Sequence, residues 1–162
     1  MFSADLLTRA ETLLADARAK KLKIATAESC TGGLVSALLT EIAGSSDVFE
    51  RGFVSYSNQA KQELLGVPEA MLIQHGAVSE EVAGAMVQGA LLHSHADLAV
   101  AVTGIAGPGG GSAEKPVGLV HVAAARKGGK TLHRECRFGD IGREAVRIAT
   151  VDTALEMLSA LA

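Results

Sequence analysis

One continuous apolar run, Leu-Ala-Val-Ala-Val at 98–102, restricts the fold more than any other segment of this chain. A strand without polar alternation has both faces covered, which is typical of a sheet packed between two layers of helices. Two further strands are predicted at 22–27 and 48–56, and segments with helical spacing of apolar residues follow each of them. The pattern therefore predicts strands that alternate with helices.

The order of the remaining elements predicts the sheet topology. Helices are expected at 4–20, 34–42, 58–65, 69–74, from 79 onward, and 141–161. Helical crossovers make the first three strands parallel, whereas the short turn at 127–130 joins two last strands, near 117–125 and 131–138, as an antiparallel hairpin. We expect a three-layer α/β/α sandwich with a mixed five-stranded sheet, its first three strands parallel and the fourth antiparallel, as a single domain of residues 1–162.

Composition excludes several classes of protein. With 162 residues, 48% of them hydrophobic, the chain can form a core without disulfides or metal staples. The two cysteines, Cys30 and Cys136, lie far apart and suggest reduced thiols in a cytoplasmic protein. No apolar segment predicts a membrane span or an export signal. A net charge of −3 and few aromatic residues argue against stable nucleic-acid binding.

The predicted ends of the first three strands are polar. They read Glu-Ser at 28–29, Ser-Tyr-Ser-Asn at 55–58, and a glycine-rich segment at 103–112. Because ligands of open α/β sheets bind beyond the carboxyl ends of parallel strands, these segments are expected to share one rim.

The first of these segments, 25–33, delivers Ser29 into a tight turn immediately before a helix. Unpaired backbone N–H groups at such a place can hold a phosphate or stabilise an oxyanion. The residues of this turn predicted to contact a substrate are Glu28, Cys30, Thr31, Gly32 and Gly33. The alternative is that Glu28, Ser29 and Thr31 only cap the helix.

Lys61 and Tyr56 are predicted to activate Ser29. A serine nucleophile needs a base, and a lysine desolvated beside apolar walls can lose its proton near neutral pH. We therefore predict Ser29 as nucleophile, Lys61 as base and Tyr56 as relay, against the alternative of a solvated lysine and a tyrosine at the edge of the core. Cys30 is a rival nucleophile, but its side chain is expected to project differently from the turn.

The glycine-rich loop is predicted to form the opposite wall of the site. It does not match the phosphate loop of nucleoside triphosphatases, yet its backbone can approach an anion closely. The residues assigned to substrate binding on this rim are Asn58, Thr103, Gly104, Gly107, Gly109 and Gly110. A flexible connection without a binding role is the alternative.

Two arginines and two histidines complete the candidates. Arg143 and Arg147 share one face of the last helix and suggest an anionic partner, although ion pairs with Asp140 and Glu144 would explain them equally well. His93 and His95 have no neighbouring carboxylate or thiol that would complete a ligand set, so no metal site is predicted.

Segments 27–33, 52–58 with Lys61, and 102–110 resemble, in order and spacing, the motifs of the CinA C-terminal family. The resemblance covers nearly the whole chain. It implies a nicotinamide-nucleotide amidase that converts nicotinamide mononucleotide to nicotinic acid mononucleotide and ammonia, as a homo-oligomer without metal or organic cofactor.

The resemblance also implies residue roles. Ser29 falls at the family's nucleophile, Tyr56 and Lys61 at its activating pair, Thr103 and the glycines after it at the substrate-lining segment, and Arg143 at a cationic substrate contact. Arg147 is added from helical spacing alone. Some relatives carry a large N-terminal domain similar to molybdopterin-binding proteins, which this chain lacks, so an activity of that domain is not expected.

Two other functions remain open from the sequence. The first is a non-catalytic module that binds a nucleotide or a partner and is linked to competence or the DNA-damage response. The second is a hydrolase of another small amide, because the rim predicts a phosphate more clearly than it predicts a pyridine ring.

Overall fold

The computed structural model describes residues 1–162 and contains one five-stranded sheet in the order β2-β1-β3-β4-β5. The strands are β1 (Ile24–Glu28), β2 (Phe49–Val54), β3 (Leu98–Gly104), β4 (Leu119–Arg126) and β5 (Thr131–Arg137). β1 pairs in parallel with β2 and β3, whereas β4 is antiparallel to both β3 and β5. The predicted fold class is confirmed.

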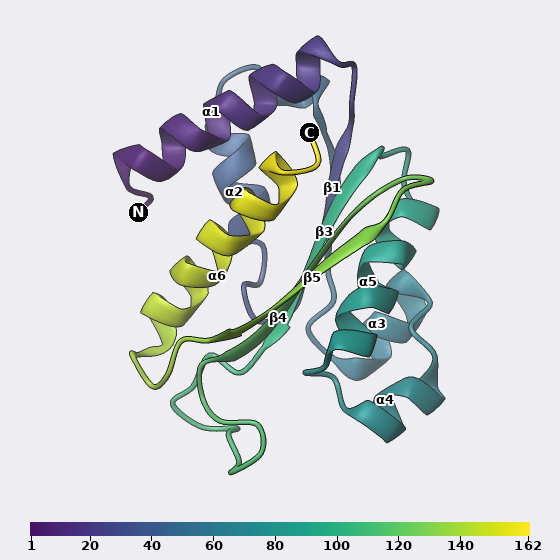
Figure 1. The fold of residues 1–162 in the computed structure, drawn as a ribbon, viewed down its shortest axis with the longest axis vertical. Coiled ribbons are helices and arrows are strands. Elements are labelled where there is room, and N and C mark those ends of the chain that lie inside the picture. Colours follow the sequence, from purple (N-terminus) through teal and green to yellow (C-terminus); the bar gives the residue numbers. More distant parts are fainter.

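Helices cover both faces of this sheet. They are α1 (Ala4–Ala19), α2 (Leu34–Glu41), α3 (Asn58–Leu65), α4 (Glu69–His75), α5 (Glu80–Leu92) and α6 (Arg143–Ser159). In Figure 1, α1, α2 and α6 lie on one side of the sheet and α3, α4 and α5 on the other. Three layers result, as the alternation of strands and helices predicts.

The ends of some elements differ from the predictions, at residues with positive φ and at a short 3₁₀ helix. The last helix begins at Arg143 and not at 141, because Gly142 has φ 96°, outside the helical region. The first strand begins at Ile24, two residues later than predicted, since the left-handed Lys21 (φ 57°) turns the chain after α1. A short 3₁₀ helix, Ser45–Asp47, occupies the predicted loop after α2.

Serine side chains fix three helix starts. Ser3, Ser57 and Ser79 each accept a hydrogen bond from the backbone N–H three residues later, at the start of α1, α3 and α5. The last of these caps, with acidic residues in the first turn of α5, was predicted from the sequence. These caps fix the residues at which α1, α3 and α5 begin.

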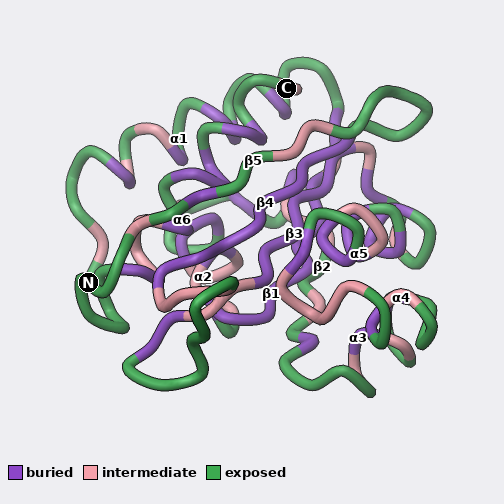
Figure 2. The backbone as a smooth tube through the Cα atoms, turned by 60° about the horizontal axis from the view of Figure 1, so that its bottom comes forward, coloured by how far each residue is buried: buried purple, intermediate pink, exposed green.

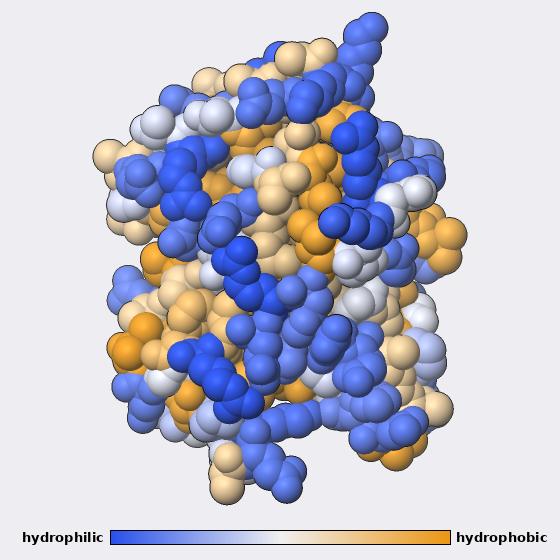
Figure 3. Space-filling view, in the orientation of Figure 1, coloured by the Kyte–Doolittle hydropathy of each residue, from blue (hydrophilic) through white to orange (hydrophobic).

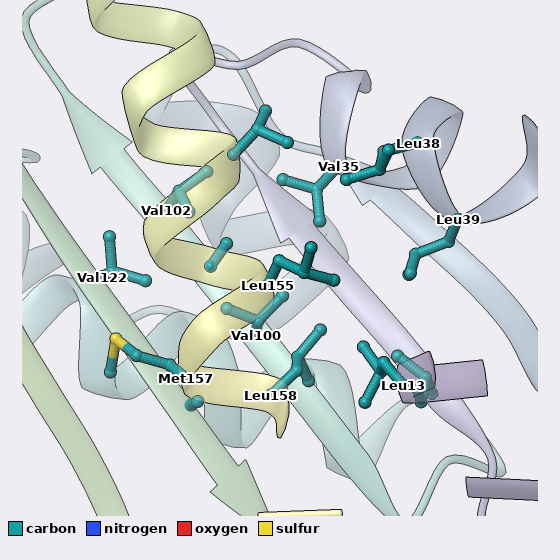
Figure 4. Packing of buried hydrophobic residues seen from close by; sticks show 14 of the residues in the cluster. Leu13, Val35, Leu38, Leu39, Val100, Val102, Val122, Leu155, Met157 and Leu158 are labelled. Atoms are coloured by element: carbon teal, nitrogen blue, oxygen red, sulfur yellow. The ribbon is translucent and has the colours of Figure 1, made fainter. Parts of the chain in front are cut away.

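The two faces of the sheet differ in side-chain size. Leu98, Val100 and Val102 of β3 face α1, α2 and α6 in a cluster of 26 buried residues, part of which is seen in Figure 4. Ala99 and Ala101 point to the other side, into a cluster of 16 residues with α5. Figure 2 shows the buried central strands between helices whose outer surfaces are exposed. The small side chains let α5 lie close to the sheet.

Strand register brings three polar strand ends to the same level. Glu28, the last residue of β1, pairs with Val54 of β2 on one side and Val102 of β3 on the other. The residues that follow these strands therefore leave the sheet side by side. This rim is where a site was predicted.

One face of the molecule mixes polar and apolar residues. In Figure 3, hydrophilic residues form much of the visible face and hydrophobic residues show between them. None of the helices combines the length and the hydropathy needed to cross a bilayer.

Two glycines of α5 provide a matched test of this packing. A Cβ at Gly89 would overlap the backbone carbonyl of Leu65 at the end of α3, whereas a Cβ at Gly84 would meet nothing within 4 Å. We expect Gly89→Ala to lower the free energy of unfolding by about 2 kcal/mol. Gly84→Ala should raise it by about 0.5–1 kcal/mol, because alanine favours the helix. Denaturant unfolding checks both, and equal effects would contradict the close approach of α3 to α5.

Candidate active site

Ser29 is the first residue after β1 and begins a tight turn. Its N–H donates to the carbonyl of Val102 on β3 at 3.0 Å, and its own carbonyl accepts from the Gly32 N–H at 3.0 Å. Gly32 and Gly33 have φ of 58° and 105°, a region that favours glycine, and they turn the chain into α2. The turn thus fixes Ser29 between strand and helix.

Glu28 stabilises this turn from inside the protein. Its carboxylate is buried and accepts hydrogen bonds from the Thr31 hydroxyl at 2.7 Å, the Val35 N–H at 2.8 Å, and the N–H and hydroxyl of Ser36 at 3.0 and 2.8 Å. Gly33 offers α2 no capping side chain, so Glu28 satisfies the first helical N–H groups instead. The side chains of Glu28 and Thr31 thus point away from the predicted substrate contact. Glu28 follows the capping alternative, whereas the Thr31 hydroxyl donates to the Glu28 carboxylate and caps no N–H.

Lys61 of α3 reaches Ser29 from the neighbouring loop. Its side chain is only 1% exposed, and its Nζ lies 3.0 Å from Ser29 Oγ, 3.1 Å from the Ser55 carbonyl and 3.3 Å from the Tyr56 carbonyl. All three contacts are neutral oxygens. Burial without a carboxylate lowers the pKa of Lys61.

The three contacts of Lys61 suit a neutral amine. Such an amine donates its two hydrogens to the carbonyls of Ser55 and Tyr56, and its lone pair then faces the Ser29 hydroxyl. In that state the serine is the donor. This is the arrangement that a general base needs next to a nucleophilic hydroxyl.

Tyr56 is placed differently from the predicted relay. Its carbonyl accepts from Lys61, but its hydroxyl accepts from Nη2 of Arg143 at 2.9 Å, and the residue is 59% exposed. The second arm of Arg143 donates to the Gly107 carbonyl at 2.8 Å. Tyr56 and Arg143 thus form the rim of the site, and no hydrogen bond joins the tyrosine hydroxyl to Lys61 or Ser29.

Cys30 lies beside Ser29 yet is a poor candidate for the nucleophile. It is 5% exposed, and burial raises the pKa of its thiol to about 11. Since the thiolate is the reactive form, the thiol is almost fully protonated near neutral pH.

A cavity of about 270 Å³ opens at Ser29. Eleven predicted residues line it: Ser29, Cys30, Tyr56, Asn58, Lys61, Thr103, Gly104, Gly107, Gly109, Gly110 and Arg143. Five others do not: Glu28, Thr31, Gly32, Gly33 and Arg147. The structure therefore brings all three strand ends to one cavity but leaves most of the Ser29 turn behind it.

Four lining residues were missed by the sequence analysis: Ala77, Val78, Ile105 and Ala106. The last two lie within the glycine-rich loop and could have been included with it. Ala77 is held in place by the hydroxyl of Thr103, which donates to its carbonyl at 2.8 Å. No sequence signal marks this contact, because it joins residues 26 positions apart.

The glycine-rich loop presents free donors to the cavity. The backbone N–H groups of the lining residues 106, 107, 109 and 110 donate to no acceptor in the protein. A row of such N–H groups, with the Arg143 guanidinium beside Gly107, can bind an anion. By contrast, no three His, Cys, Asp or Glu side chains come together where they could hold a metal ion.

A family model described as the CinA C-terminal domain matches residues 7–162. The chain belongs to the CinA C-terminal domain family. It is 50% identical over 159 residues to the nicotinamide-nucleotide amidohydrolase PncC of Escherichia coli K12, covering 98% of this chain and 95% of that protein. The family resemblance seen in the sequence is confirmed.

Other CinA relatives are longer. A protein of Caldicellulosiruptor bescii named for competence and damage induction is 61% identical over 108 residues, which are 67% of this chain but 26% of that protein.

Solved structures show the same fold. The competence/damage inducible protein CihA of Agrobacterium tumefaciens superposes with a TM-score of 0.98 at 57% identity, covering 99% of this chain and 98% of that one. The CinA superfamily protein ECK1530/EC0983 of E. coli gives 0.92 at 32% identity, covering 100% and 94%.

The burial of Lys61 predicts a conflict between stability and reactivity. Replacing it by methionine, which has a similar length and no charge, should raise the free energy of unfolding near neutral pH by about 1 kcal/mol. The pKa of Lys61 is lower in the folded protein than in the unfolded chain. Between these two pKa values the unfolded chain binds more protons than the folded protein. The free energy of unfolding of the wild type therefore rises with pH until the ordinary pKa of lysine is reached. The advantage of Lys61→Met should therefore shrink as pH rises, as denaturant titrations from pH 6 to 10 would show. An advantage that grows with pH would contradict this assignment.

Proposed function

We propose that this chain hydrolyses the carboxamide of nicotinamide mononucleotide, giving nicotinic acid mononucleotide and ammonia. The observation that carries the proposal is the buried amine of Lys61, 3.0 Å from the Ser29 hydroxyl with two carbonyls as its other partners. The name of the E. coli relative, which aligns over nearly its full length, supports the same reaction.

Acylation begins when Ser29 Oγ attacks the carboxamide carbon. Neutral Lys61 takes the hydroxyl proton as the C–O bond forms, and the carbonyl oxygen becomes an oxyanion. When the tetrahedral intermediate collapses, the C–N bond breaks and the Lys61 ammonium returns its proton to the leaving nitrogen, which departs as ammonia. An acyl ester on Ser29 remains.

Deacylation repeats these roles with water. Lys61, neutral again, accepts a proton as water attacks the ester carbon, and it then protonates Ser29 Oγ as the serine leaves. The product is a carboxylic acid, and the enzyme regains its starting protonation state. Both half-reactions require that Lys61 lose its proton readily, which burial favours.

The rest of the cavity is suited to a nucleotide. The carboxamide would lie at Ser29, and the phosphate would meet the free N–H groups of the glycine-rich loop and Arg143. The exposed ring of Tyr56 stands between these two regions at the rim.

We include in the proposal a single domain, residues 1–162, that acts in the cytoplasm as a homo-oligomer without metal or organic cofactor. The single domain follows from the length and composition, and the cytoplasm from the two separated cysteines. The homo-oligomer and the absence of a cofactor come from the family resemblance. Ammonia release in a chelator-containing buffer and the mass in solution test these last two features.

The nucleophile can be identified by three variants. Ser29→Ala and Lys61→Ala should each lower kcat at least about a hundredfold, because each removes a group that takes part in acyl transfer. Cys30→Ala should retain most activity. Ammonia release from a panel of amides, including nicotinamide mononucleotide, measures these effects and separates the proposed reaction from hydrolysis of another small amide.

An active Ser29→Ala variant together with an inactive Cys30→Ala variant would show that the nucleophile is Cys30 and not Ser29. A wild-type chain that binds the nucleotide but releases no ammonia from any amide would instead favour the non-catalytic binding module.

Arg143 is expected to bind the phosphate. Arg143→Ala should weaken the apparent binding free energy of the nucleotide by about 1.5–3 kcal/mol, because a charge-assisted contact is lost. Arg143→Lys should recover only part of this, because an ammonium lacks the planar fork. Nicotinamide riboside, which has no phosphate, is the matched control in steady-state kinetics. Equal penalties on both compounds would show that Arg143 does not bind phosphate.

A further inference from the structure

Arg147 of α6 contacts the back of the Ser29 turn with a charged fork. Its Nε donates to the Cys30 carbonyl at 3.1 Å and its Nη2 to the Thr31 carbonyl at 2.9 Å. It does not line the cavity at Ser29. One rigid guanidinium therefore holds two successive peptide groups directly after the nucleophile.

These contacts determine where the N–H groups of the turn point. In a trans peptide the N–H is directed opposite to the carbonyl, and the bonds of this turn are trans. The Cys30 carbonyl, held by Arg147, shares its peptide with the Thr31 N–H. The Ser29 carbonyl, held by the Gly32 N–H, shares its peptide with the Cys30 N–H.

The N–H groups of Cys30 and Thr31 are unoccupied. Neither donates to an acceptor in the protein, whereas those of Ser29 and Gly32 both do. Cys30 lines the cavity and Thr31 is fully buried behind it, so the Cys30 N–H is the free donor that an oxyanion at Ser29 can reach.

We propose that the Cys30 N–H is a donor of the oxyanion hole and that Arg147 is the positioning residue that orients it. Arg147 holds the Thr31 carbonyl, whose peptide carries the Gly32 N–H. That N–H holds the Ser29 carbonyl, whose peptide carries the Cys30 N–H. The inference rests on the acyl transfer proposed above. As Ser29 attacks, the Cys30 N–H would stabilise the charge on the former carbonyl oxygen. Arg147 acts through the backbone and touches neither the substrate nor the reacting atoms.

The turn needs such a support because its own sequence leaves it free to change. Gly32 and Gly33 give the backbone a wide choice of conformations. Glu28 fixes the far end through Thr31 Oγ1 and the N–H groups of α2, but no other side chain holds the carbonyls of Cys30 and Thr31. Without Arg147, the turn could change and the peptide between Ser29 and Cys30 could rotate and withdraw the donor.

The test compares Arg147→Ala and Arg147→Lys with the wild type on nicotinamide mononucleotide and on nicotinamide riboside. Removal of one oxyanion donor costs about 10²–10³ in kcat, so an indirect loss of orientation should lower kcat about 30- to 100-fold with KM changed less than about threefold. The loss should be equal for both substrates, and lysine should restore part of it. The pH at which activity half-disappears should not move, because Lys61 is untouched.

Chemical rescue gives a second measurement. A hollow lined by Phe2, Leu34 and Ile148 lies next to Arg147, so a guanidinium ion can reach the space that Arg147→Ala leaves. Millimolar guanidinium should raise the kcat of this variant several-fold and leave the wild type unchanged. Arg134→Gln is the matched control, because Arg134 ties the other end of α6 through Glu156 at 2.8 Å and should keep full activity.

Several results would overturn the inference. The first is a rise in KM confined to the nucleotide, which would show that Arg147 contacts the phosphate. The second is a loss of kcat that follows the folded fraction measured by circular dichroism. The third is the absence of rescue by guanidinium.

The ester p-nitrophenyl acetate separates this inference from the proposed function. If the wild type acylates Ser29 with the ester but hydrolyses no nucleotide, the proposed substrate is wrong and the Arg147 variants are judged on the ester. Absence of Ser29-dependent acyl transfer from both compounds would overturn both proposals.

Discussion

The site depends on one buried amine that has no counter-ion. Lys61 sits at the first turns of α3 with only neutral oxygens around its Nζ, and this environment favours the uncharged form. A carboxylate in the same place would have stabilised the ammonium and left Ser29 without a base. The carbonyls of Ser55 and Tyr56 are therefore as important as the side chains, since they orient the amine without holding its proton.

A second constraint is that opposite charges hold the Ser29 turn from two sides. The buried Glu28 carboxylate satisfies the N–H groups at the start of α2, and Arg147 satisfies carbonyls in the middle of the turn. Both residues were predicted to contact substrate, and both instead contact the backbone. Charged residues near a nucleophile thus need not face the ligand, because a turn rich in glycine requires partners of its own.

Local sequence patterns predicted the fold and much of the site. The apolar run of β3, the serine cap of α5 and the hairpin turn at 127–130 are all encoded within a few residues, so the topology could be predicted. The meeting of Ser29, Lys61 and the glycine-rich loop followed from the rule that ligands bind at the ends of parallel strands. The hydrogen-bond partners of the Tyr56 and Thr103 hydroxyls could not be predicted. The bonds of Tyr56 to Arg143 and of Thr103 to Ala77 join residues 87 and 26 positions apart, and composition alone does not determine which partner a hydroxyl selects.

The alanine face of the sheet has a consequence for substrate selection. Ala99 and Ala101 set how near α5 lies to β3, and the segment leading into α5 supplies Ala77 and Val78 to the cavity wall. Methyl groups in the core, which do not line the cavity themselves, thus influence its width. A larger core residue at one of these alanines would move the wall outward, so relatives could admit different amides with identical reacting groups. Specificity in such a protein can be changed from the inside of the sheet.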